Sequence, residues 1–163
     1  LELNMSHAGD WGLIAVGHRN PVGVDIEAIT PDRASPELIR AVTSTAERAA
    51  FAALPTREHA VAFFRLWVRK EAVIKALGTG LSRPLDTIDV PLAAEAPPRG
   101  VVLRPSQADG EPAPVRCWWL WDVPAPLGHL AALVVGQPAD EPPRPPMPPG
   151  WLTLDDLERP HGA

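Results

Sequence analysis

The sequence predicts an α+β fold in which an antiparallel sheet packs on one long helix. Three observations support this prediction. Short apolar runs alternate with turn residues in the first third of the chain, one long helical pattern fills the middle, and strand-like runs follow residue 84. A chain of 163 residues, 45% of them hydrophobic, can bury one core of ordinary size.

Three strands are predicted at residues 1–5, 11–16 and 22–26, because turn residues separate these apolar runs. Two short helices are predicted at residues 36–41 and 46–54. The second has Ser44 or Thr45 as its cap, with Glu47 near its start.

A longer helix is predicted at about residues 57–77. Its apolar residues recur at intervals of three to five, and it ends before Gly78, as helices often do. Its apolar stripe must be covered, so we expect it to pack across the sheet. Further strands are predicted at residues 87–92, 101–104, 115–123 and 130–136.

Residues 1–139 are expected to form one domain, and residues 140–163 a connector and tail. Proline dominates residues 141–150, which favours an extended spacer over a segment that binds an aromatic groove. Trp118, Trp119 and Trp121 are interpreted as sheet core or interface rather than as a platform for stacked bases.

Composition excludes several classes of partner. The net charge of -5 argues against nucleic acid, and no apolar window approaches the ~20 residues that span a membrane. The single cysteine, Cys117, cannot form an internal disulfide, which fits a reducing cytoplasm. We therefore expect a cytoplasmic protein. The histidines show no spacing typical of a zinc site.

Acidic residues on two predicted elements suggest a metal site. Asp25 and Glu27 share one face of a strand, because strand side chains alternate. Trp67, Glu71 and Lys75 recur at intervals of four on the long helix, so a third carboxylate can meet the strand pair. Such carboxylates suit Mg2+. A solvated strand face and a Glu71–Lys75 surface ion pair are the alternatives.

Only two of the 15 basic residues are lysines, Lys70 and Lys75, and both flank Glu71. Lysine is a compact, mobile charge suited to phosphate, although chance clustering also explains the spacing. Ser6 and His7, near a predicted strand end, offer further donors to phosphate oxygens, and a plain turn is the alternative. A nucleophilic Ser-His pair is not favoured, because adjacent strand residues point apart.

Five motifs occur in order along the chain: Asn-x-Ser-His, Gly-Val-Asp-Ile-Glu, Trp-x-x-Lys-Glu-Ala-x-x-Lys, Gly-Thr-Gly-Leu-Ser and Leu-Asp-Thr-Ile-Asp-Val. This ordered set resembles the surfactin-synthetase-activating (Sfp) type of 4'-phosphopantetheinyl transferase, mostly its C-terminal half. The similarity is strong over residues 3–90 and weak as far as residue 136.

The resemblance implies transfer of the phosphopantetheine arm of coenzyme A to a serine of an acyl or peptidyl carrier protein, releasing 3',5'-ADP. By the family's pattern, Asp25, Glu27 and Glu71 would hold Mg2+ against the diphosphate, and Glu71 would be the base for the carrier serine. The residues that would contact coenzyme A are Ser6, His7, Lys70 and Lys75, with Lys75 also steadying the leaving group.

Two departures from the family's pattern are visible. Val68 stands where the family often has a small hydroxyl or thiol residue, which should affect packing more than chemistry. The chain also begins almost at the Ser-His motif, whereas larger members have two similar halves with the site between them. We therefore expect an upstream N-terminal half, or a second copy as in the smaller holo-acyl-carrier-protein synthases, to cover a partly apolar surface beside the site.

Two other functions are compatible with the same residues. An Mg2+-dependent phosphohydrolase would use water instead of a carrier serine as the nucleophile. A non-catalytic half would bind coenzyme A or a partner half without modifying a carrier.

Overall fold

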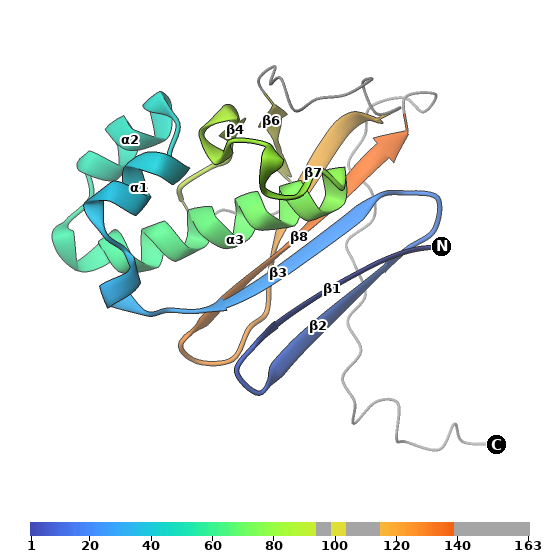
Figure 1. Ribbon diagram of the computed structural model, residues 1–163, viewed down its shortest axis with the longest axis horizontal. Coiled ribbons are helices and arrows are strands. Elements are labelled where there is room, and N and C mark those ends of the chain that lie inside the picture. Colours follow the sequence, from blue (N-terminus) through green and yellow to red (C-terminus); the bar gives the residue numbers. More distant parts are fainter. Residues whose placement is uncertain (94–98, 104–114, 139–163) are drawn as a thin grey trace.

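The computed structural model describes residues 1–93, 99–103 and 115–138 (Figure 1). The predicted connector and tail, residues 140–163, lie outside the described residues, as does residue 104 of one predicted strand. The strands are β1 Glu2–Ala8, β2 Trp11–Gly17, β3 Val22–Ala28, β4 Ile88–Asp89, β5 Arg99–Gly100, β6 Val102–Leu103, β7 Val115–Val123 and β8 His129–Pro138. The helices are α1 Pro36–Val42, α2 Thr45–Ala52 and α3 His59–Leu77, with short 3-10 turns η1 Pro31–Arg33, η2 Thr56–Glu58, η3 Gly80–Ser82 and η4 Leu85–Thr87.

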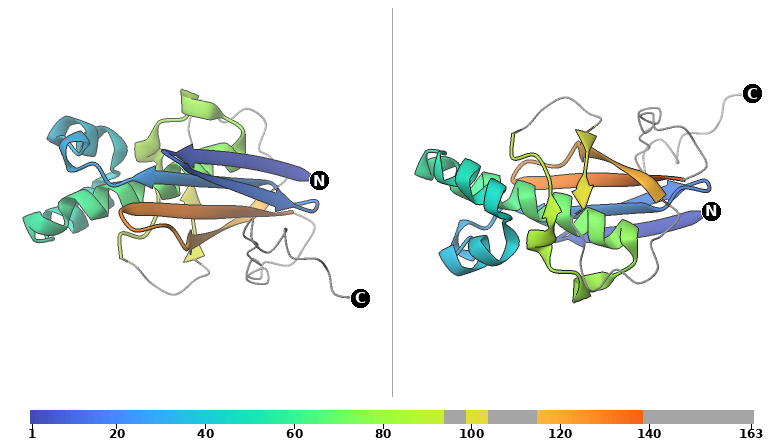
Figure 2. Two further views of the ribbon diagram at one scale, coloured as in Figure 1. Left: turned by 90° about the horizontal axis from the view of Figure 1, so that it is seen from below. Right: turned by 90° about the horizontal axis from the view of Figure 1, so that it is seen from above.

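An antiparallel sheet in the order β3-β8-β7-β5 is the centre of the fold. Helix α3 lies across one face of this sheet, and α1 and α2 lie near the N-terminal end of α3 (Figures 1 and 2). Strands β1 and β2 form an antiparallel hairpin beside β3, and β4 pairs with β6. The predicted α+β architecture, an antiparallel sheet packed on one long helix, is confirmed.

Two predicted elements differ from the structure. Strand β1 continues through Ala8, because the hairpin register stays paired as far as Ala8 and Trp11 and turns at Gly9, whose φ is +58°. Ser6 and His7 therefore lie within a strand rather than at its end. The predicted strand at residues 87–92 is short, since η4 occupies its beginning and pairing stops after Asp89.

Side chains of β3 alternate between the two faces of the sheet, as predicted. Val22, Val24 and Ile26 pack with apolar residues of β2, β7 and β8 on the face away from α3. Gly23 lies directly against the backbone of α3. Because Asp25 and Glu27 share the face of Gly23, β3 presents both carboxylates to the helix side of the sheet.

The contact between α3 and β3 is unusually close at Gly23. A Cβ atom at this position would lie 2.0 Å from the carbonyl oxygen of Ala72 and 2.5 Å from the amide nitrogen of Ala76. Both neighbours are helix backbone, which cannot move aside as a flexible side chain can. Glycine is therefore the residue that allows α3 to approach the strand next to Asp25.

Replacement of Gly23 by alanine should destabilise the fold by at least about 2 kcal/mol, because overpacking against backbone forces the helix away from the sheet. Urea unfolding of Gly23→Ala and of the parent chain measures the difference. Gly12→Ala is the matched control, since a Cβ there meets nothing closer than 3.9 Å. Equal losses in both variants would contradict the importance of this contact.

Candidate functional site

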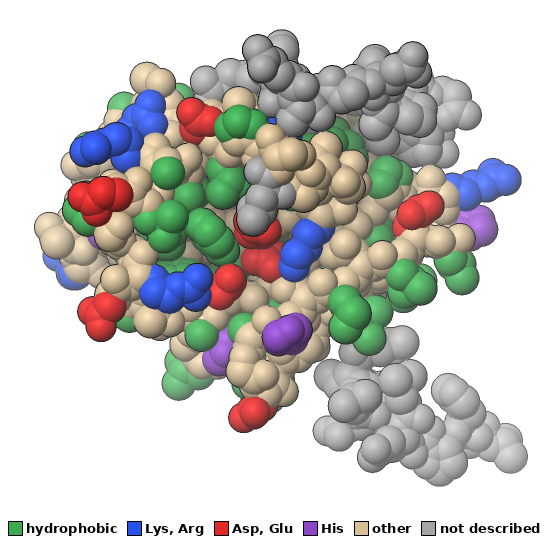
Figure 3. Space-filling model, in the orientation of Figure 1, with side chains coloured by type: hydrophobic (Ala, Val, Ile, Leu, Met, Phe, Trp, Pro, Cys, Tyr) green, Lys and Arg blue, Asp and Glu red, His purple; other side chains and the backbone are tan. Residues whose placement is uncertain are grey.

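Helix α3 brings Glu71 and Lys75 to the carboxylate of Asp25 on β3. The Lys75 ammonium donates to Asp25 Oδ1 at 2.7 Å and to the carbonyl oxygen of Val24 at 3.2 Å. Burial raises the pKa of Glu71, and the nearby carboxylates of Asp25 and Glu27 raise it further, whereas Lys75 opposes the shift. Figure 3 shows acidic side chains next to a basic one near the middle of this face.

Two carboxylate oxygens in this cluster are buried without a hydrogen-bond donor among the residues that the structure describes. They are Asp25 Oδ2 and Glu71 Oε1. Asp25 is only 4% exposed, and Glu71 is partly buried. A buried acceptor without a partner destabilises the fold, and native proteins rarely retain one without a functional reason. These two oxygens are the atoms of the cluster best suited to hold a divalent cation.

Glu27 lies at the edge of the cluster and is held by other partners. Its Oε1 accepts a hydrogen bond from the indole nitrogen of Trp67 at 3.2 Å, and its Oε2 lies 3.6 Å from the guanidinium of Arg33. Within the described ranges, no group of three or more His, Cys, Asp or Glu side chains is arranged to hold a metal ion. The set of three carboxylate ligands therefore stays a prediction.

Strand β1 is attached to the edge of β3 through side chains. Asn4 Oδ1 accepts the backbone N–H of Val24 at 3.1 Å, and Ser6 Oγ accepts that of Ile26 at 3.3 Å. The Ser6 hydroxyl donates to Asp25 Oδ1 at 2.7 Å, so its single proton is already used. Ser6 thus orients Asp25 in this structure.

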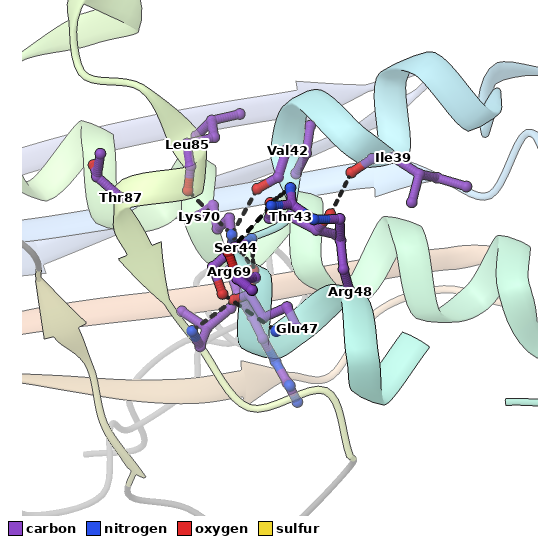
Figure 4. A network of polar contacts seen from close by, with 12 residues as sticks. Ile39, Val42, Thr43, Ser44, Glu47, Arg48, Arg69, Lys70, Leu85 and Thr87 are labelled. Carbon is purple, nitrogen blue, oxygen red and sulfur yellow. Dashed lines mark hydrogen bonds and ion pairs between the residues drawn. The ribbon is translucent and has the colours of Figure 1, made fainter. Parts of the chain in front are cut away.

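The other residues predicted to bind coenzyme A are placed differently. His7 is exposed on β1, on the face opposite to Ser6, and is not part of the carboxylate cluster. Lys70 also lies outside the cluster. Its side chain is fully buried, and its ammonium donates to Glu47 Oε2 at 2.5 Å, to the carbonyl oxygen of Val42 at 2.7 Å and to that of Leu85 at 3.1 Å (Figure 4).

The network around Lys70 is saturated. All three ammonium protons have acceptors, and Glu47 also accepts from the backbone N–H groups of Ser44 at 2.8 Å and Val90 at 2.9 Å. Burial lowers the pKa of Lys70, and the Glu47 carboxylate opposes that shift. The network joins α1, α2, α3 and the segment after α3. Because all three protons of the Lys70 ammonium are used in it, none is left to donate to a phosphate.

The sequence predicted no role for Asn4 or Trp67. Each shares a strand or helix face with a residue that was predicted for the site. Asn4 is two residues before Ser6, and residues at that spacing share a strand face. Trp67 begins the stripe that continues with Glu71 and Lys75. The shared spacing was the available signal for both residues.

Comparison with known proteins identifies the family. Residues 21–123 match the family described as the 4'-phosphopantetheinyl transferase superfamily, and this range is more than half of the chain. The chain belongs to this superfamily. The resemblance expected from the ordered motifs is therefore confirmed.

Several curated superfamily members are similar in sequence. The chain is 35% identical over 92 residues to a 4'-phosphopantetheinyl transferase of Bacillus subtilis, an alignment that covers 56% of this chain and 40% of that protein. It is 38% identical over 89 residues to Sfp of Bacillus subtilis strain 168, covering 55% and 38% of the two chains. The chain thus spans about two fifths of the length of these relatives.

Two solved structures share the fold. Holo-[acyl-carrier-protein] synthase of Thermotoga maritima superposes with a TM-score of 0.53 at 19% identity, over 72% of this chain and 63% of that one. Holo-ACP-synthase of Plasmodium yoelii gives a TM-score of 0.53 at 16% identity, over 71% of this chain and 92% of that one. Among the described residues of this chain, no helix is long and apolar enough to cross a membrane.

Glu71→Gln should stabilise the fold at neutral pH. Because the pKa of Glu71 is raised, the folded state holds the Glu71 proton more tightly than the unfolded chain does. Ionisation of Glu71 therefore lowers the free energy of unfolding as the pH rises from the pKa of the unfolded chain through that of the folded state. We expect a gain in the free energy of unfolding at about pH 7.5 that shrinks as the pH falls toward the ordinary pKa of a glutamate. Urea unfolding at several pH values measures this gain. The exposed Glu58→Gln is the control, and an equal effect in both variants would contradict the account.

Lys70→Met should destabilise the fold by about 3–5 kcal/mol, because it leaves the buried Glu47 carboxylate without its cation. Adding Glu47→Gln should recover part of the loss, since the double variant buries no unpaired charge. Chemical unfolding of the single and double variants tests this expectation. If Lys70→Met is as stable as the parent chain but binds coenzyme A more weakly, the result would instead support the contact between Lys70 and coenzyme A that the family resemblance implied.

Proposed function

We propose that this chain forms the catalytic half of an enzyme that transfers the 4'-phosphopantetheine arm of coenzyme A to a serine of an acyl or peptidyl carrier protein. The other product is 3',5'-ADP, and the reaction depends on Mg2+. One observation carries the proposal: a superfamily member holds two unpartnered buried carboxylate oxygens, on Asp25 and Glu71, where α3 crosses β3.

The donors of the site fit a hard divalent cation. Mg2+ prefers carboxylate oxygens and keeps positions for water and substrate phosphates, and Asp25 Oδ2 and Glu71 Oε1 are oxygens of this kind. When bound, the ion would neutralise charge on the diphosphate of coenzyme A. Glu27 would complete the set if its carboxylate left Trp67 and Arg33.

Glu71 is also the best candidate for the base. Its raised pKa makes its carboxylate a better proton acceptor near neutral pH than an ordinary glutamate, and general bases work best when their pKa lies close to the working pH. It would take the proton of the carrier serine, directly or through one water. Lys75 would hold the diphosphate, and His7, exposed on β1, would donate to a phosphate at the rim.

A second half is expected to cover the outer face of the β1–β2 hairpin. The outer face of the β1–β2 hairpin carries the cross-strand pairs Leu3–Val16 and Met5–Ile14, and all four side chains are 62–72% exposed. Contiguous apolar exposure of this kind is typical of an interface. Because the chain spans only two fifths of its curated relatives, we propose an upstream half or a second copy of the chain as the covering partner.

An apo-carrier protein incubated with coenzyme A, Mg2+ and this chain tests the proposal by mass spectrometry. The expected result is a carrier that gains one phosphopantetheine arm, with Glu71→Gln slowing the reaction by about 100-fold or more. Glu58→Gln, an exposed acid near the start of α3, should leave the rate unchanged. The assay is run with and without an added N-terminal half from a superfamily member.

The remaining outcomes separate the alternatives. Coenzyme A that is hydrolysed without a carrier would indicate a phosphohydrolase. Coenzyme A binding without carrier modification, even with a second half present, would indicate a non-catalytic half. Either result would contradict the proposed transfer.

A further inference from the structure

Lys75 and the unpartnered oxygen of Asp25 belong to the same carboxylate group. The Lys75 ammonium binds Oδ1 at 2.7 Å, while Oδ2 is buried with no donor in the described part of the chain. The Lys75 side chain is 27% exposed and the Asp25 side chain 6%, so the lysine reaches from the surface to a buried anion. The carboxylate thus carries one cation on one oxygen and has its second oxygen available to another.

We infer that Lys75 is a replaceable cation: it neutralises Asp25 until a divalent ion binds there, and the displaced ammonium then binds a phosphate of the substrate. The inference rests on the proposed function and adds a coupling to it. The Lys75 ammonium cannot bind Asp25 and a phosphate at the same time. Binding of the divalent cation at Asp25 and binding of the phosphate would therefore be linked through Lys75.

Electrostatics explains why the two cations should exchange. A divalent ion on Oδ2 would lie within a few ångströms of the ammonium on Oδ1, in a site where burial weakens screening by water. The repulsion acts on the more mobile partner, which is the flexible lysine stem. Asp25 would then have the ion as its counter-charge in place of Lys75, so the buried carboxylate would stay compensated.

The surroundings of Lys75 allow this movement. Within the described residues, its other hydrogen bond is one of 3.2 Å to the carbonyl oxygen of Val24. Lys70, five residues earlier on the same helix, differs in each respect: it is fully buried and uses all three protons on fixed acceptors. Lys75 should therefore move and Lys70 should not.

The composition of the chain makes the test direct, because Lys70 and Lys75 are its only lysines. A 15N-lysine-labelled 163-residue chain should show two side-chain ammonium signals at low temperature, which Lys75→Arg assigns. In a second, uniformly 15N-labelled sample, the backbone amide signals of Asp25 and Glu71 report Mg2+ binding independently. On titration with Mg2+ alone, the Lys75 ammonium should exchange with water at least about 10-fold faster, while Lys70 is unchanged.

A second measurement tests the coupling. Calorimetry of Mg2+ binding, with and without inorganic pyrophosphate, should show that pyrophosphate tightens Mg2+ binding about 5-fold or more in the parent chain. Lys75→Met should bind Mg2+ alone more tightly than the parent chain and lose most of the pyrophosphate effect. Arginine at the same position should lower the Mg2+ affinity, because a guanidinium is less readily displaced from a carboxylate.

Three results would overturn the inference. One is Mg2+ binding that shifts the amides of Asp25 and Glu71 but leaves the Lys75 ammonium unchanged. Another is a pyrophosphate effect that persists in Lys75→Met. The third is the absence of any Mg2+ response. Carrier modification is measured separately, so a chain that transfers the arm while Lys75 stays on Asp25 refutes the exchange and leaves the proposed function intact.

Discussion

The candidate site depends on the close contact between α3 and β3. Gly23 allows the helix backbone to approach the strand, and Asp25 lies two residues further along the same strand face. The helix then supplies Glu71 and Lys75 at a spacing of four, so both side chains reach the same stretch of β3. A side chain at residue 23 would separate the two elements and with them the charged groups.

The charged side chains of α3 differ in whether their polar atoms have partners. Arg69, Lys70 and Glu71 are consecutive, so they leave the helix in different directions. Arg69 binds both carboxylate oxygens of Asp122, at 2.8 and 2.6 Å, and Lys70 has three acceptors. Glu71, in contrast, keeps a buried oxygen for which the described ranges supply no donor. Proteins tolerate such local inconsistency mainly at functional sites.

The sequence predicted the fold well where a regular pattern was long enough. The periodicity of the long helix located α3, and alternation along residues 22–27 placed Asp25 and Glu27 on one strand face, which in the structure is the helix side of β3. The partners of individual polar groups could not be predicted in the same way. Lys70 pairs with Glu47, 23 residues away, because tertiary packing buries both side chains together. No local sequence pattern predicts that pairing.

The role of Ser6 illustrates the same limit. Its hydroxyl looked free when β1 was expected to end at residue 5, but pairing with β2 extends the strand and directs Ser6 toward β3. The resemblance to a family placed Ser6 among the residues expected at the site. It did not show that Asn4 and Ser6 are bound to the edge of β3, which depends on the exact register of two strands.

We propose that the unpartnered oxygens of Asp25 and Glu71 receive one divalent cation. A crystal structure of this chain with Mn2+, used as an anomalous scatterer in place of Mg2+, tests it most directly. The account predicts a single anomalous peak within about 2.3 Å of Asp25 Oδ2 and Glu71 Oε1, at the crossing of α3 and β3. A peak elsewhere, with these two oxygens still unpartnered, would contradict it.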